Sequence, residues 1–406
     1  MAGEWEEVPL GDVITLQRGF DLPSQDRKPG KVPIVSSSGI SDYHSDVGVI
    51  GPGVVTGRYG TIGQVFLIKD DYWPLNTTLW VKDFHGNDPQ FASYLLRTVD
   101  FRSCSDKSSV PGVNRNDLHR IPVLRPPLAE QKAIAAVLGV LDDKIELNRR
   151  MNATLEAMAR ALFQSWFVDF DPVRAKLDGR QPTGLDQATA ALFPATFQDS
   201  PLGPIPRGWT AKPLPEAVEV NPRRTLKAGT IAPYLDMKNL PTQGHSADEV
   251  VGREFSSGTK FHNGDTLLAR ITPCLENGKT GYVDFLADGQ VGWGSTEYIV
   301  FAPKPPLPPQ FGYLLARSDA LRTHAIQNMT GTSGRQRVPS ECFSNFQLAV
   351  PTPAIAHRFD ELTAPLMAKI KANSNESRTL ATLRDTLLPK LLRGELTVPQ
   401  AERCTA

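Results

Sequence analysis

Two long stretches of the chain carry hydrophobic residues at the alternating four- and three-residue spacing that is typical of a coiled coil. The first stretch has at these positions Ile134, Leu138, Leu141, Ile145, Asn148, Asn152, Leu155, Ala159, Leu162 and Trp166. The second has Phe359, Thr363, Leu366, Ile370, Asn373, Ser377, Leu380, Arg384, Leu387 and Leu391. A 3.5-residue period that persists over several heptads specifies helices packed along a shared seam. The pattern therefore predicts two long helices, each about 40 residues or roughly 60 Å long at 1.5 Å per residue, whose apolar seams cover each other.

The middle of this predicted seam is polar. Asn148 and Asn152 of the first helix are matched by Asn373 and Ser377 of the second. Buried polar residues in a coiled coil fix the register or the orientation of the helices at a cost in stability. We therefore expect these four residues to determine how the two helices pair.

The helical stretches belong to a longer internal repeat. At one constant offset the first stretch recurs in the second, so that Leu141 corresponds to Leu366. A second match lies upstream of each helix, "PQFASYLLR" from Pro89 and "PQFGYLLAR" from Pro309, and a third, "EWEEVPL" and "GWTAKPL", lies nearer the start of each half. Self-similarity of this kind indicates a duplication, in which each half is a globular region followed by a long helix.

The globular regions have the pattern of β-rich domains. "VGVIGPGVVTGRYGTIGQVFLI" and "TGYVDFLADG" consist of short β-branched runs separated by Gly and Pro. We predict an α+β fold with an internal pseudo-two-fold duplication. The two β-rich domains are expected at residues 1–125 and 206–350, and the two long helices at residues 126–170 and 351–396. A Pro- and Gly-rich connector with one short helix is expected at residues 171–205, and a tail at residues 397–406.

Composition narrows the class of protein. The 406 residues are 40% hydrophobic and 22% charged, as in an ordinary globular protein, and the net charge is zero. Zero net charge argues against general electrostatic attraction to nucleic acid or membrane but leaves local patches open. We expect no membrane span and no secretory leader, because no apolar run reaches about 18 residues and the start is acidic. Four widely spaced cysteines, Cys104, Cys274, Cys342 and Cys404, form no zinc motif and fit a reduced, cytoplasmic setting.

The motifs that would mark an enzyme are missing from the sequence. "ENGKTG" from Glu276 ends like a phosphate-binding loop, but Pro273 occupies the place of its first glycine. "GRYGTIG" from Gly57 lacks the spacing of a dinucleotide fingerprint and favours a turn or bulge. Neither a nucleophile elbow nor a zinc-protease motif is found. We therefore expect no catalytic residue, no metal site and no cofactor in this chain.

Four segments together resemble a known family. They are "PPLAEQKAIAAVLGVLDDKIELN" from Pro126, "ALFQSWFVDFDPV" from Ala161, "SPLGPIPRGW" from Ser200 and "LLPKLLRGEL" from Leu387. With the duplication, they make nearly the whole chain resemble the specificity (S) subunit of type I restriction–modification systems.

The resemblance implies two target-recognition domains held by two antiparallel helices that form a coiled coil. It implies recognition of a bipartite, asymmetric target in double-stranded DNA, without catalysis by the chain itself. The implied partners are two modification subunits, which use S-adenosylmethionine to methylate adenine, and restriction subunits, which use ATP and Mg²⁺ to cleave DNA. One departure is that "AEQ" from Ala129 in the first helix has "AIAHRF" from Ala354 as its counterpart. The docking faces of the two helices are therefore not strictly equivalent in sequence.

Candidate DNA contacts lie in polar loops of the two globular regions. Arg58 and Arg270 end equivalent strands, and arginine binds guanine in bidentate fashion or a phosphate, with a structural salt bridge as the competing role. "TGTSGRQR" from Thr330 is the best single loop, because donors crowd a Gly-rich segment. The full set of candidates is Ser36, Ser37, Ser38, Arg58, Tyr59, Asn114, Lys238, Asn239, Arg270, Lys279, Thr332, Ser333, Arg335, Gln336 and Arg337.

Candidate partner-binding residues lie at the end of the first helix. Phe163, Trp166, Phe167 and Phe170 give this end more apolar surface than one helical seam needs, and we predict that it docks a modification subunit. Two other functions remain open from the sequence. The chain could be a stand-alone DNA-binding regulator or structural scaffold, or an unrecognised fused DNA methyltransferase or nuclease, which would bind S-adenosylmethionine by itself.

Overall fold

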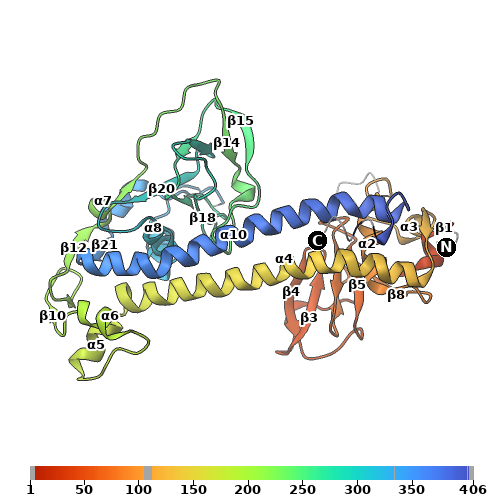
Figure 1. Ribbon diagram of the computed structural model, residues 1–406, viewed down its shortest axis with the longest axis horizontal. Coiled ribbons are helices and arrows are strands. Elements are labelled where there is room, and N and C mark those ends of the chain that lie inside the picture. The colour runs from red at the N-terminus through yellow and green to blue at the C-terminus, as the bar shows by residue number, and fades with distance from the viewer. Residues whose placement is uncertain (1–4, 105–111, 333, 400, 402–406) are drawn as a thin grey trace. The chain divides into compact units, whose positions relative to one another are not determined.

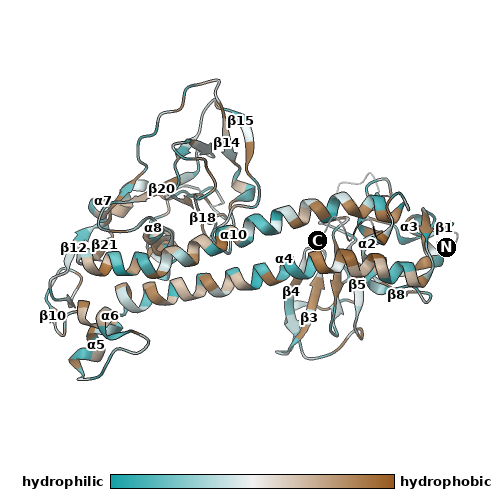
Figure 2. Cartoon of the chain, viewed as in Figure 1, coloured by the Kyte–Doolittle hydropathy of each residue, from teal (hydrophilic) through white to brown (hydrophobic). Residues whose placement is uncertain are grey.

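The computed structural model describes residues 5–104, 112–332, 334–399 and 401. The chain forms two compact units (Figure 1). Unit 1 comprises Met1–Glu146 and Ser377–Ala406, and unit 2 comprises Leu147–Glu376. Helices α4 (Leu128–Phe163) and α10 (Pro353–Leu392) each contribute one part to each unit. Figure 2 shows along both helices the mixture of hydrophobic and hydrophilic positions that the heptad pattern describes. None of the helices within the described residues has the length and apolar character needed to cross a membrane.

Unit 1 is built on short strands and three short α-helices besides its share of the long ones. These elements are β1 (Glu6–Pro9), α1 (Leu10–Val13), β2 (Thr15–Arg18), η1 (Ser24–Asp26), β3 (Val32–Ser36), β4 (Gly39–His44), β5 (Gly53–Gly57), β6 (Val65–Ile68), β7 (Trp73–Pro74), β8 (Thr78–Asp83), α2 (Pro89–Arg97), α3 (Arg115–His119) and β9 (Pro122–Arg125).

Unit 2 contains a larger set. These elements are η2 (Gln164–Val168), α5 (Asp171–Leu177), α6 (Gln187–Leu192), β10 (Phe197–Gln198), β11 (Ile205–Pro206), β12 (Thr210–Pro213), α7 (Leu214–Ala217), β13 (Val218–Val220), β14 (Ile231–Leu235), η3 (Met237–Asn239), β15 (Val251–Glu254), β16 (Thr259–Phe261), β17 (Thr266–Ala269), β18 (Thr280–Tyr282), β19 (Gly292–Gly294), β20 (Tyr298–Pro303), α8 (Pro309–Ala316), α9 (Asp319–Gln327), η4 (Ser340–Asn345) and β21 (Gln347–Val350). The connector thus holds two short helices, α5 and α6, where the sequence pattern predicted one.

The two units repeat one strand topology. Strand order β2-β8-β5-β6 in unit 1 corresponds to β13-β20-β17-β18 in unit 2, and β4-β3-β7 corresponds to the first three strands of β15-β14-β19-β16. The parallel pair β3–β7 recurs as β14–β19, and the antiparallel pair β1–β9 recurs as β12–β21. This is the topology that the duplication predicted from the sequence would produce.

The long helices pair within each unit. In unit 2, Asn148 on α4 donates to Glu376 at 2.7 Å and Asn152 accepts from Asn373 at 2.9 Å, while the ring of Phe163 lies 6.5 Å from that of Phe359. Residue numbers fall along α10 as they rise along α4, so the two segments run antiparallel. Asn148 and Asn373 are each only 1% exposed, which confirms a buried polar seam.

One short helix in each unit rests on this helical pair through hydrogen bonds to carboxylates. In unit 1, α2 contributes Tyr94 and Arg97, which both donate to Asp142 on α4. In unit 2, α8 contributes Tyr313, whose hydroxyl donates at 2.7 Å to Glu156 on α4. Because these carboxylates are largely withdrawn from water, the bonds fix where each set of sheets meets its helices.

Candidate functional site

The first predicted cluster, in unit 1, gathers around the end of β5. The guanidinium of Arg58 lies 4.6 Å from the centre of the Tyr59 ring. Ser37 lies next to these two residues. A Cβ atom built on Gly60, which directly follows Tyr59, would lie 3.3 Å from the Ser37 Oγ. Arg58, Tyr59 and Ser37 therefore lie close together, as candidate contacts to one ligand must.

Three other unit 1 candidates have local structural roles. Ser36 Oγ donates to the Gly39 carbonyl and is also bonded to Ser38, so both serines hold the β3–β4 turn. Asn114 is the N-cap of α3, with its Oδ1 accepting from the backbone N–H of Asn116 at 3.0 Å. These hydrogen bonds account for Ser36, Ser38 and Asn114 without any ligand.

Arg270 in unit 2 has the same backbone setting as Arg58 in unit 1. The Arg58 N–H donates to the Thr77 carbonyl and its carbonyl accepts from Val113, just as the Arg270 N–H donates to Glu297 and its carbonyl accepts from Val338. The two arginines therefore occupy equivalent positions in the repeated fold, although the surrounding loops differ.

Several unit 2 candidates are engaged within the chain. Arg337 makes a bidentate ion pair with Glu297, at 2.7 Å between Nη2 and Oε1. Lys279 Nζ donates to the carbonyls of Met237 and Lys238. These bonds brace loops and occupy the charged ends of Arg337 and Lys279.

The remaining unit 2 candidates differ in how freely they present their side chains. Asn239 donates to the backbone and carboxylate of Glu249, and the Gln336 N–H donates to Thr272. Thr332, Arg335 and Lys238 are exposed. Ser333 lies outside the described residues.

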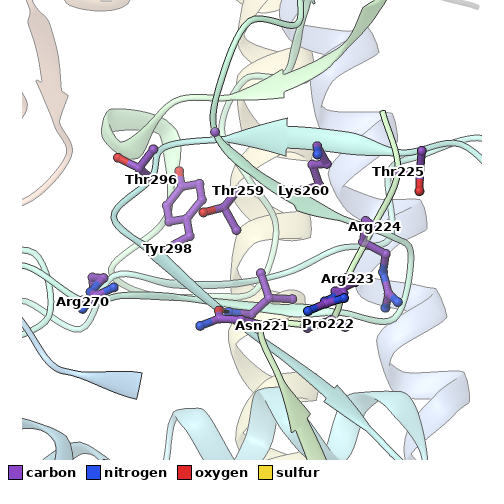
Figure 3. Close-up of a pocket in the computed structure, with 12 residues that line it drawn as sticks. Asn221, Pro222, Arg223, Arg224, Thr225, Thr259, Lys260, Arg270, Thr296 and Tyr298 are labelled. Carbon is purple, nitrogen blue, oxygen red and sulfur yellow. Dashed lines mark hydrogen bonds between the residues drawn. The ribbon is translucent and has the colours of Figure 1, made fainter. Parts of the chain in front are cut away.

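Arg270 faces a basic pocket of about 530 Å³ that the sequence analysis did not predict (Figure 3). Arg223, Arg224 and Lys260 line it together with Arg270, and they come from the segment after β13, from β16 and from the end of β17. The Nε of Arg270 is buried without a hydrogen-bond acceptor among the described residues. Four cationic side chains converging on one cavity favour an anionic or hydrogen-bond-accepting ligand.

Two of these arginines differ in what balances their charge. Arg224 lies 3.0 Å from Asp265, whose side chain is 4% exposed. Burial raises the pKa of Asp265, while the backbone N–H of His262 and the charge of Arg224 act against this rise. Arg223 is exposed and has no ion-pair partner among the described residues. Arg224 therefore stabilises the wall of the pocket, and Arg223 keeps its charge available.

Asn221 determines the direction in which this basic segment leaves the sheet. Its φ of 54° lies in the left-handed region, which Asn tolerates better than most residues. Its N–H donates to the Val300 carbonyl at 2.8 Å, and its Oδ1 accepts from the Val300 N–H at 3.0 Å. The chain thereby leaves the sheet edge in a fixed direction. The signal in the sequence was "NPRRTLK" from Asn221, a turn-forming Asn-Pro followed by clustered charge.

Three of the four predicted docking aromatics are buried inside unit 2, and Phe170 is half-buried. Phe163, Trp166 and Phe167 are 4%, 1% and 8% exposed, and Phe170 packs against the same core. Phe167 lies 4.8 Å from Phe359, and Phe170 lies 5.6 Å from the Trp209 ring. The rings of Phe163, Trp166 and Phe167 are thus covered by the chain's own distant segments, whereas Phe170 is half-buried.

The described residues contain no cluster of three or more His, Cys, Asp or Glu side chains placed to hold a metal ion. The cationic side chains of the pocket are suited to binding a polyanion or to hydrogen-bonding with base edges.

Comparisons with known proteins agree with this interpretation. Residues 2–157 match the family described as Type I restriction modification DNA specificity domain. The chain is 26% identical to the type I restriction enzyme HindI specificity subunit of Haemophilus influenzae, over 93% of this chain and 89% of that protein. It is 24% identical to the MjaIX specificity subunit of Methanocaldococcus jannaschii, over 84% and 76%. The fold is similar to that of a type I restriction–modification S subunit from M. genitalium, with a TM-score of 0.56, 15% identity and 96% of both chains covered.

Proposed function

Because the chain belongs to the family of type I restriction–modification specificity subunits, we propose that its two units each read one part of a bipartite, asymmetric target in double-stranded DNA. The observation that carries this proposal is the repeated topology with Arg58 and Arg270 at the same backbone position. An arginine can form a bidentate contact with guanine in the major groove. Because the loops around the two arginines differ in sequence, the two units are free to read different bases.

The contacts within unit 2 divide its candidate residues by role. Arg270 is the proposed base reader, because its guanidinium faces the pocket and its Nε lacks an acceptor among the described residues. Arg223 and Lys260 are suited to phosphates, which contribute affinity rather than sequence preference. Arg337 is a supporting residue, because Glu297 holds its guanidinium.

The chain directs chemistry that its partners perform. We propose assembly with two modification subunits, which carry S-adenosylmethionine and methylate adenine, and with restriction subunits, which supply ATP- and Mg²⁺-dependent cleavage. Such complexes act on DNA in the cytoplasm. This chain contributes recognition and takes no part in methyl transfer or hydrolysis.

Docking of the partners requires exposed side chains in place of the buried aromatics. In unit 1, α4 exposes Val140 at 66%, and in unit 2 it exposes Leu147 at 52% and Met158 at 50%. Large apolar side chains this exposed on a helix are suited to an interface. We therefore propose that the modification subunits dock at these residues.

Long-read mapping of methylated bases in cells with and without this gene tests the proposal. Methylation at adenines of a bipartite motif should require the gene and the modification subunit together. Methylation that persists without the gene would contradict the proposal. Binding of S-adenosylmethionine by the isolated chain would point to a fused methyltransferase instead.

A further inference from the structure

The second sheet of unit 2 carries an aromatic layer outside the loops considered so far. Four residues lie in one row across its strands, because Val251 pairs with Tyr234, Tyr234 with Trp293, and Trp293 with Lys260. Residues paired across strands project from the same face of a sheet. The Tyr234 and Trp293 rings lie 4.5 Å apart.

Arg253 on β15 lies over this layer. Its guanidinium is 4.7 Å from the centre of the Tyr234 ring and 5.7 Å from that of Trp293. The side chain is exposed, and within the described residues it has no carboxylate partner. Stacking on two rings restricts the guanidinium while its N–H edges stay accessible, so less conformational entropy is lost when an anion binds.

The same layer is continuous with the basic pocket. Lys260 belongs to the row and also lines the pocket, with its Nζ 5.0 Å from the centre of the Phe255 ring. It too has no ion-pair partner among the described residues. A cation on the sheet and the cations of the pocket therefore form one surface, which favours a single extended polyanion over a separate ligand.

Unit 1 uses the equivalent position differently. In its matching sheet, Ile34 pairs with Trp73 as Tyr234 pairs with Trp293, and His44 pairs with Val32 as Arg253 pairs with Ala232. His44 lies 5.4 Å from the Trp73 ring but is only 2% exposed.

His44 is also occupied by its surroundings. Its Nδ1 accepts from the Lys28 N–H at 3.0 Å, and its Nε2 lies 3.5 Å from Asp46. At this position of the duplicated fold, unit 1 thus has a buried histidine and unit 2 has an exposed arginine. At this position unit 2 therefore presents a charge to solvent, whereas unit 1 presents none.

We propose that Arg253 binds a backbone phosphate of DNA beside the half-site read by unit 2, and that unit 1 makes no such contact at His44. The inference rests on the proposed DNA-recognition function and adds to it an electrostatic inequality between the two units. A phosphate contact of this kind adds affinity for any sequence and leaves base preference unchanged.

The test compares the assembled complex carrying Arg253→Gln, Arg253→Lys or Arg207→Gln with the unaltered complex. Arg207 lies in the segment between β11 and β12, is exposed and loses the same charge. Binding is measured across 50–200 mM salt to a duplex carrying the motif found by methylation mapping and to a scrambled duplex of the same length. Far-ultraviolet circular dichroism confirms that each variant retains its fold.

Arg253→Gln should reduce the slope of log affinity against log salt by about 0.9 on both duplexes, which amounts to roughly three- to fourfold across this salt range. Arg253→Lys and Arg207→Gln should keep the original slope, and all variants should methylate the original motif. An unchanged slope in Arg253→Gln, an equal decrease in Arg207→Gln, or an altered motif would each overturn the phosphate assignment. A failure of the unaltered complex to bind either duplex would instead defeat the proposed function itself.

Discussion

Asp142 is the point at which unit 1 is expected to be most sensitive to a single change. Its carboxylate accepts from the Tyr94 hydroxyl at 2.8 Å, from Arg97 at 3.1 Å and from Arg384 at 2.6 Å. It therefore joins α2 to both long helices within this unit. Asp142→Ala would leave two arginines and a hydroxyl without their shared acceptor.

The expected cost follows from how far these groups are withdrawn from water. The side chains of Asp142, Arg97 and Arg384 are 26%, 28% and 21% exposed. Breaking a fully buried pair costs about 3–5 kcal/mol, whereas exposed pairs contribute about 0.2–1 kcal/mol. We expect an intermediate loss of about 2–3 kcal/mol. Asp143→Ala is the matched control, because Asp143 and its partner Lys69 are 69% and 74% exposed, and should cost less than about 1 kcal/mol.

The effect should also depend on pH. Burial raises the pKa of Asp142, but the hydrogen bond from Arg384, the charge of Arg97 and the Tyr94 hydroxyl outweigh it, so the pKa is lowered in the folded state. A lowered folded-state pKa contributes stability that is present above the unfolded pKa of about 3.9 and is lost as pH falls through the folded value. The difference between Asp142→Ala and the unaltered chain should therefore shrink below about pH 4.

Hydrogen exchange measured by mass spectrometry resolves the two units. Peptides from α2 and from the C-terminal part of α10 should lose protection in Asp142→Ala, while peptides from α8 in unit 2 should not. Equal effects of Asp142→Ala and Asp143→Ala would contradict this role of Asp142, as would an equal loss of protection in α8.

The remaining predictions concern recognition and assembly. Arg270→Ala should relax the methylated motif at one base pair, at a cost of about 1–3 kcal/mol in discrimination between bases, whereas Arg337→Ala should keep the motif. Methylation mapping of both variants tests this, and an unchanged motif in Arg270→Ala would contradict a base-reading role for Arg270. Leu147→Glu should weaken binding of a modification subunit in co-purification. Leu202→Glu is the control and should not weaken binding, because it changes a 42% exposed leucine that lies between α6 and β12. Equal binding by both variants would contradict docking at Leu147.

Features that depend on local periodicity were predictable from the sequence. The heptads located α4 and α10, and the buried asparagines of the seam were recognisable because polar residues interrupt an apolar repeat. The duplication was visible as matching segments, and the repeated strand orders agree with it. Arg58 and Arg270 were identified as equivalent because each directly follows a strand in its own half.

Features that depend on distant partners were not predictable. The aromatic end of α4 suggested a docking site, because nothing nearby in sequence indicates that Phe359 and Trp209 cover it. The sequence suggested that Arg337 contacts DNA, because its ion pair with Glu297 is not visible there: Glu297 lies forty residues earlier in the chain. The basic pocket was not predictable for the same reason, since its cations come from three separate segments, which belong to two different sheets of unit 2.

If each unit reads its own part of the DNA target, as we propose, exchanging one unit should change only one half of the methylated motif. The most direct test replaces residues 1–125 with the corresponding part of another specificity subunit and maps the methylated motif by long-read sequencing. We expect that one half of the bipartite motif changes to that of the donor and that the other half is retained. A chimera that still methylates DNA but changes both halves, or neither, would contradict it.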